Sequence, residues 1–244
     1  MTEFTTWRSL VDGAEISAIP DSVIDNFEDA DANPAGLYSD EDTVADFWPH
    51  DNGHDAMNRS DENVAVGGHS LRINADTSDV SIPARWSVPS DETLPRYVEP
   101  GDTVKVLMRD DSDRIRPSLG VMVDGSENPD CYAVRLRGDE DEVAIRKGYS
   151  LADDDPRDGA TSLSTESPSL NSGDWYWVEY QLPDEDNDEH QVDVYELDGE
   201  DRGDQVTTVT ANDDELIEGD GVALIAESGS GDTEVIDEIE ILDD

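Results

Sequence analysis

Short runs in which apolar and polar residues alternate make up most of the chain after residue 22. The clearest alternation lies in 104–109 and 132–137. A period of two residues is typical of a β-strand with one buried face. Further runs, bounded by Gly, Pro, Asn, Asp or Ser, lie at 70–73, 119–123, 143–146, 175–182, 192–195, 206–209, 222–226 and 235–241. Since no window predicts a strong amphipathic helix, we expect an all-β fold of two packed antiparallel sheets, a jelly-roll sandwich.

The chain divides into two parts of unequal size. Residues 1–22 carry large apolar side chains at irregular spacing, namely Phe4, Trp7, Leu10 and Ile16. An exposed patch of this kind would be sticky, so we expect an N-terminal docking arm that packs either on its own domain or on a neighbouring subunit. Residues 23–244 form the predicted sandwich. Its longest loops, expected at 33–62, 79–95 and 153–172, are rich in Asp, Ser, Pro and Gly.

Charge restricts the setting and the partners. The 244 residues include 63 acidic and 15 basic ones, which gives a formal net charge of -48. Such a charge would expand the compact state at ordinary ionic strength, whereas the Debye length is only about 3 Å in 1 M salt. We therefore expect a protein that folds in molar salt. The 35% hydrophobic content favours a core over disorder.

The same composition excludes several classes of partner. Nucleic acid is not expected as a ligand because no basic stripe could neutralise phosphates. No apolar run approaches the roughly 20 residues that span a bilayer, and residues 1–7 lack the features of an export signal, so membrane insertion is not expected. Cys131 is the only cysteine, which leaves no disulfide within the chain and no cysteine-based metal site.

One predicted strand carries a candidate sugar site. If Tyr176, Val178, Tyr180 and Leu182 face the core, the opposite face holds Trp175, Trp177, Glu179 and Gln181. An indole ring can stack on a pyranose while carboxylate and amide groups bind its hydroxyls. Arg135 and Arg137, off the core face of their own strand, could contribute. The alternative is that a loop or another subunit covers both tryptophans.

Other candidate chemistry is less specific. Acidic clusters at 110–113, 153–155 and 184–188 could hold a structural calcium ion, although no cofactor is required. His50 and His54 could ligate zinc if a third ligand converged. Glu238 and Glu240 resemble part of a glycosidase signature, but Glu stands where Asp is expected and the run is the last strand, so we expect no enzyme. Asn58 begins a short glycosylation sequon.

The ordered set of runs resembles the concanavalin A-like, laminin-G-type jelly roll. The stretches that carry the resemblance are 24–29 (IDNFED), 66–73 (VGGHSLRI), 100–104 (PGDTV), 132–136 (YAVRL), 173–180 (GDWYWVEY), 192–199 (VDVYELDG) and 236–241 (IDEIEI). The resemblance implies that the first and last strands of the domain pair side by side. Because the fold serves both carbohydrate-binding modules and glycoside hydrolases, it implies no single activity.

The arm is similar to the openings of structural proteins of haloarchaeal tailed viruses, through 6–13 (TWRSLVDG) and 18–22 (AIPDS). This second resemblance implies a virion component, such as a tail, fibre or head-spike subunit. The expected partners are then copies of itself, other virion proteins and a host surface glycoprotein or glycan. The alternative is a monomeric, non-viral carbohydrate-binding module or hydrolase-like domain that acts on extracellular polysaccharide.

Overall fold

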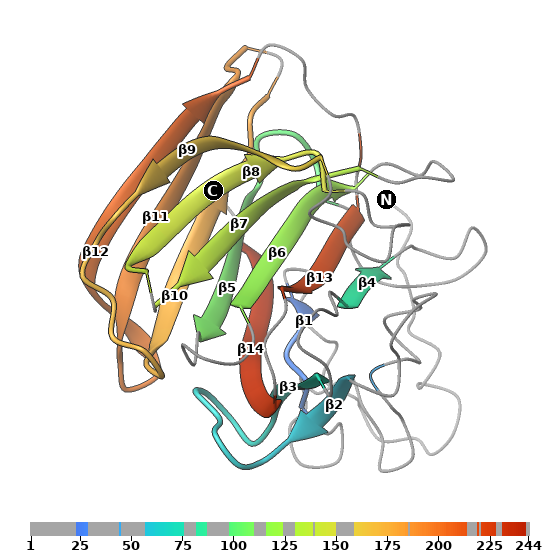
Figure 1. The fold of residues 1–244 in the computed structure, drawn as a ribbon, viewed down its shortest axis with the longest axis vertical. Helices are drawn as coiled ribbons and strands as arrows, with labels where there is room; N and C mark the ends of the chain where they lie inside the picture. Colours follow the sequence, from blue (N-terminus) through green and yellow to red (C-terminus); the bar gives the residue numbers. More distant parts are fainter. Residues whose placement is uncertain are drawn as a thin grey trace, which may run out of the picture.

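The computed structural model contains two antiparallel β-sheets packed face to face (Figure 1). It describes residues 23–28, 44, 57–75, 82–86, 98–109, 116–123, 130–138, 140–149, 159–184, 186–213, 219, 221–227 and 231–242. The predicted docking arm, residues 1–22, and its apolar residues Phe4, Trp7, Leu10 and Ile16 lie outside the described residues.

The larger sheet has eight strands. Its order is β12 (Asp201–Asn212), β11 (Glu189–Asp198), β10 (Trp175–Gln181), β5 (Thr103–Arg109), β14 (Gly231–Leu242), β3 (Ser70–Ala75) and β2 (Met57–Ser60), with β1 (Val23–Asp25) paired to β14. The six-stranded sheet has the order β4 (Ile82–Trp86), β13 (Gly221–Glu227), β6 (Arg116–Val123), β7 (Tyr132–Arg137), β8 (Glu142–Lys147) and β9 (Thr161–Glu166). The all-β jelly-roll prediction is confirmed.

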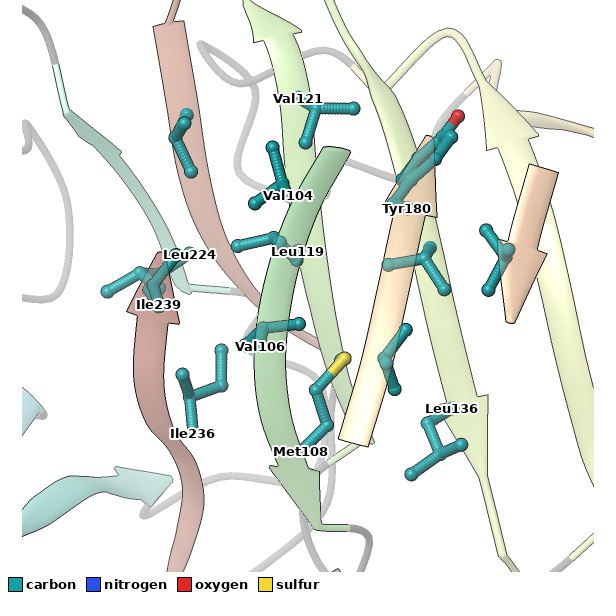
Figure 2. Close-up of a cluster of buried hydrophobic side chains, with 14 of the residues drawn as sticks. Val104, Val106, Met108, Leu119, Val121, Leu136, Tyr180, Leu224, Ile236 and Ile239 are labelled. Atoms are coloured by element: carbon teal, nitrogen blue, oxygen red, sulfur yellow. The ribbon is translucent and has the colours of Figure 1, made fainter. Parts of the chain in front are cut away.

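The main core lies between the two sheets. In Figure 2, Val104, Val106 and Met108 of β5 face the side chains of the opposite sheet, including Leu119 and Leu224. All five are fully buried. Tyr176, Val178, Tyr180 and Leu182 also belong to this core, as their alternation predicted. The inward face of β10 is thereby fixed, and its other residues must point away from the core.

Three strands lie inside segments that the sequence predicted to be loops. β2 lies within 33–62, β4 within 79–95 and β9 within 153–172, so those loop predictions are wrong over these strands. Each of the three is the terminal strand of its sheet. An edge strand has fewer buried neighbours, and β9 shows this because none of its side chains is buried.

The two ends of the described domain meet in the larger sheet. β1 pairs with β14 through Val23 and Glu240, as the family resemblance implied. Two buried carboxylates then hold the segment between β2 and β3. Glu28 accepts hydrogen bonds from the backbone N–H of Gly68 (2.6 Å) and His69 (2.9 Å). Asp237 of β14 accepts those of Ala65 (2.9 Å) and Val66 (3.0 Å).

Glycine is required at position 67, beside the Glu28 carboxylate, for two reasons. Its φ is +72°, a conformation that L side chains rarely adopt, and a Cβ atom would lie 2.4 Å from Glu28 Oε1. The paired glycines at 67 and 68 thus follow from the carboxylate that packs against them.

Candidate functional site

The outward face of the eight-stranded sheet, which we call the outer face, carries a row of charged side chains across five strands. Strand register places Glu240 of β14, Lys105 of β5, Glu179 of β10, Asp193 of β11 and Thr208 of β12 opposite one another in succession. Neighbouring members come from adjacent strands, which are about 4.8 Å apart. We call this set the charged row.

Two further rows run parallel to it. On one side lies the aromatic row, which contains Leu107, Trp177, Tyr195 and Gln205. On the other side lies the amide row, which contains Thr103, Gln181, Gln191 and Thr210. The outer face therefore combines ring surfaces, ion pairs and neutral hydrogen-bonding groups in an ordered array.

Trp177 lies under a lysine side chain. Lys105 Nζ is 3.6 Å from the centre of an indole ring and 2.7 Å from Glu240 Oε1. The tryptophan is only 1% exposed, so its ring is not the open plate that the sequence predicted. A lysine side chain lies over it, whereas the alternative was a loop or another subunit over both tryptophans. Within the described part of the chain, the buried Nε1 of Trp177 has no hydrogen-bond acceptor. A buried donor without a partner costs about 1–3 kcal/mol.

Tyr195 and Arg202 form a second aromatic and cationic pair beside Trp177. Arg202 Nη1 donates to both carboxylate oxygens of Glu179 (2.6 and 2.9 Å), and its guanidinium carbon lies 4.5 Å from the Tyr195 ring centre. The hydrogen bond to Glu179 raises the pKa of Arg202, and burial raises the pKa of Tyr195. The tyrosine thus keeps its hydroxyl proton and remains a hydrogen-bond donor.

The part of the outer face near β12 is open and rich in hydrogen bonds. Asp193 accepts hydrogen bonds from Gln191 Nε2 (2.6 Å), Gln205 Nε2 (2.9 Å) and the Thr208 hydroxyl. Gln205 and Thr208 are exposed, whereas Leu107 at the β5 end of the aromatic row is fully buried. A ligand would therefore meet the outer face from the β10 to β12 side.

The structure separates two of the predicted site residues from the rest. Trp175, Trp177, Glu179 and Gln181 share the outer face, with Trp175 partly exposed. Arg135 and Arg137 alternate with core residues of β7 in the six-stranded sheet, so they point out from the opposite side of the sandwich. Arg135 pairs with Glu142 and Arg137 with Glu140. The grouping of these arginines with the tryptophans is therefore wrong.

Three residues of this site were not expected from the sequence. Lys105, Tyr195 and Arg202 come from three strands, and only the pairing register brings them beside Trp177 and Glu179. The alternation of Lys105 with two buried valines was a signal that it faced outward. No signal in the sequence indicated which strands would be its neighbours.

A separate polar cluster lies between the sheets at one end of the core. The Tyr180 hydroxyl is 2.9 Å from His190 Nδ1, and the Tyr132 hydroxyl donates to Asp213 Oδ2 (2.6 Å), which Lys147 also contacts (2.6 Å). Burial lowers the pKa of His190 to about 4. The imidazole is therefore neutral at neutral pH.

The remaining predicted sites give no ligand cluster. No group of three or more metal-ligating side chains occurs among the residues that the structure describes. His50, His54 and the acidic clusters 110–113 and 153–155 lie outside those residues. In 184–188, Asp184 Oδ1 accepts the backbone N–H of Asp186 and Asn187, which forms a turn. Structural calcium stays a prediction.

Two further predictions concern single strands. Asn58 is exposed on the edge strand β2, where a loop was expected. Glu240 is ion-paired with Lys105, and burial raises the pKa of the neighbouring Glu238.

Within the described ranges, no helical structure has the length and hydropathy of a bilayer-spanning helix.

Comparisons with known proteins show similarity in fold alone. No family model matches the sequence, and no curated protein is similar to it. The chain is similar in structure to the exoplasmic/lumenal domain of VIP36 in its Ca2+/Man-bound form, with a TM-score of 0.52, 12% identity, and coverage of 91% of this chain and 88% of that one. This similarity concerns the fold alone, a jelly-roll β-sandwich of two antiparallel sheets.

Two other solved structures are less similar. A legume lectin-like domain from Entamoeba histolytica has a TM-score of 0.47 and 7% identity, and covers 78% of this chain and 91% of that one. The carbohydrate-binding module CBM66 from Bacillus subtilis has a TM-score of 0.42 and 13% identity, and covers 67% of this chain and 86% of that one.

Proposed function

We propose that this protein is a carbohydrate-binding domain and that the outer face of the eight-stranded sheet holds the sugar without catalysing a reaction. One observation carries the proposal: strand register sets two aromatic rings, Trp177 and Tyr195, beside two ion pairs, Lys105–Glu240 and Arg202–Glu179.

The chemistry of these groups suits a polyol. Each sugar hydroxyl both donates and accepts a hydrogen bond, and the ion pairs offer ammonium and guanidinium donors next to carboxylate acceptors. The C–H face of a pyranose packs on an aromatic ring. Movement of the flexible Lys105 side chain would uncover the face of the Trp177 ring for such a contact.

Glycan-array binding in molar KCl tests the proposal. The wild type should bind at least one glycan, and Tyr195→Ala should weaken that binding at least tenfold because it removes the partly exposed ring. Trp177→Phe keeps most of the packing but presents a smaller ring, and should weaken binding several-fold. Thr165→Val is the matched control because Thr165 is exposed on β9 of the other sheet and pairs with Ala144.

Circular dichroism confirms that each variant is folded before it is tested. Absence of binding by the folded wild type on a broad array would refute the proposal. Equal binding by wild type and Tyr195→Ala would refute the location on the outer face.

The biological setting that we propose is adhesion by a virion structural protein of a halophilic archaeal virus. The acidic composition and the resemblance of residues 1–22 to virion proteins support it, and an extracellular carbohydrate-binding module is the alternative. In the virion setting the arm docks on a neighbouring copy or another virion protein, through Phe4, Trp7, Leu10 and Ile16. Deletion of 1–22 should convert an oligomer to a soluble monomer, as measured by light scattering in molar salt, and an unchanged mass would refute the docking role.

A further inference from the structure

We infer that the ligand of the outer face is a neutral, extended oligosaccharide that lies across the strands, along the three rows. This inference rests on the proposed function and adds the charge of the ligand, its length and its direction.

Ion pairs compensate most of the charges in the charged row. Lys105 is paired with Glu240 and Arg202 with Glu179, whereas Asp193 accepts hydrogen bonds from amide and hydroxyl groups. Within the charged row and Arg202, two cations and three carboxylates leave one net negative charge, that of Asp193. An anionic sugar would meet this carboxylate at contact distance, where salt screens charge least. A neutral sugar meets donors and acceptors without a net charge.

Salt strengthens this conclusion. At about 1 M ionic strength charges separated by more than about 3 Å are largely screened, so long-range attraction cannot supply affinity. Direct hydrogen bonds and ring contacts act at short range, and these are what the three rows offer. Recognition by contact rather than by charge is thus the mode compatible with the composition of the chain.

The three rows determine the length of the oligosaccharide that fits and the direction in which it lies. From Lys105 on β5 to Thr208 on β12 the charged row crosses three inter-strand intervals, about 14 Å in all. An extended pyranose chain repeats at about the strand spacing, so about four units match the four strands. Along this direction the units over β10, β11 and β12 meet a ring or amide of the aromatic row, a charged or hydroxyl group, and a neutral group of the amide row. The unit over β5 meets Lys105 and Thr103, because Leu107 is buried.

The exposed residues of β12 leave the site open at that end, so that a ligand can extend beyond the sheet. Gln205, Thr208 and Thr210 on β12 are all exposed, and β12 is the terminal strand of its sheet. A polysaccharide can therefore continue past β12 instead of ending on the sheet. A site of this kind binds internal units of a chain and does not require a terminal sugar.

Calorimetric titration in molar KCl tests the inference. The probes are neutral gluco-, manno- and xylo-oligosaccharides of one to six units, and oligogalacturonates of matching length. We expect at least one neutral series to bind, with an affinity that rises at least tenfold from one unit to four and changes little beyond. Oligogalacturonates should bind at least tenfold more weakly than that series at equal length.

Two variants at opposite ends of the outer face test the span. Lys105→Met on β5 and Gln205→Ala on β12 should each weaken binding of the six-unit ligand at least threefold, whereas Thr165→Val should not. A ligand confined to one position would respond to one of the two variants alone, and that result would overturn the extended geometry.

The outcomes separate this inference from the proposed function. Tight binding of oligogalacturonates, or equal affinity for one unit and six, would overturn the inference while leaving sugar binding intact. If no saccharide of either charge binds to the folded protein, both fall.

Discussion

The outward faces of the two sheets differ in what their side chains do. On the six-stranded sheet, Val123, Cys131, Ala133, Tyr149, Ala223 and Ile225 form a second apolar cluster that is at most 3% exposed. Gly120 leaves room for its neighbours, since a Cβ atom there would lie 3.0 Å from the Ala223 Cβ and 3.1 Å from the Cys131 Sγ. On the eight-stranded sheet the outer face carries long polar side chains that become exposed toward β12.

Side-chain size accounts for this difference. Two small outward residues, Ala133 of β7 and Ala223 of β13, let the segment after β8 pack onto the sheet, where Gly148 has a φ of +85° and Tyr149 is fully buried. On the outer face of the eight-stranded sheet, Leu107 and Trp177 are buried too, but the long, hydrogen-bonded residues of β11 and β12 stay partly or fully exposed and leave donors and acceptors for a ligand. One outward face therefore stabilises the fold, and the β11–β12 part of the other is available for binding.

The largest effect should come from Ile225→Ala on the covered face. Removal of a fully buried isoleucine typically costs about 2–5 kcal/mol, because a cavity remains where the side chain was. Gln205→Ala on the outer face should change the free energy of unfolding by no more than about 0.5 kcal/mol. Urea unfolding in molar KCl, followed by tryptophan fluorescence, measures both. Similar costs for the two variants would contradict the contrast between the faces.

The interior strands could be predicted from the sequence because burial imposes a period of two. The run 175–182 has large apolar residues at every second position, and its inward face is as expected. β2, β4 and β9 could not be predicted in this way. β9 reads Thr-Ser-Leu-Ser-Thr-Glu and buries none of its side chains, so its hydrogen bonds leave no hydrophobic pattern.

The candidate site could be predicted only within one strand. Alternation placed Trp177 and Glu179 on one face, but the partners of that face depend on strand order and register, which no local pattern contains. Arg135 shows the consequence: it alternates in the same manner, yet it belongs to the other sheet. The contact of Lys105 with the Trp177 ring could not be predicted either, because the two residues lie some 70 positions apart in the sequence.

We expect an intermediate effect from pH on the free energy of unfolding. It should arise from buried groups in the interior rather than from the outer face. Burial lowers the pKa of His190 to about 4, so the unfolded chain binds the extra proton and stability rises with pH between about 4 and 6.5. Burial raises the pKa of Asp237 to about 7, so the folded state binds the extra proton and stability falls as pH rises from about 3.8 to 7. Near His190 lie Asp213, Lys147 and Asp188, which shift its titration by smaller amounts.

The two groups should nearly cancel in the wild type, and single variants should reveal each one. Asp237→Asn leaves the His190 contribution and should add a positive slope of up to about 1.4 kcal/mol per pH unit, relative to the wild type, in the free energy of unfolding. His190→Leu should add a slope of the opposite sign. Urea unfolding at pH 4.5 to 6.5 in constant salt gives both slopes, and equal signs would refute the assignment. Tyr195→Ala, on the outer face, serves as the control with an unchanged slope.

A smaller effect on stability should come from Lys105→Met, which keeps a linear side chain over Trp177 but removes its charge. The ion pair with Glu240 and the cation–π contact are each worth about 0.5–1 kcal/mol at a partly exposed site, so we expect a loss of about 1 kcal/mol. Adding Glu240→Gln should restore part of that loss because the unpaired carboxylate is removed. The affinity for the sugar should nevertheless fall at least threefold in both Lys105→Met and the double variant with Glu240→Gln, because both lack the ammonium donor. A variant that loses stability but retains full affinity would show that this face also serves the fold, and the distinction between the two outward faces would no longer hold.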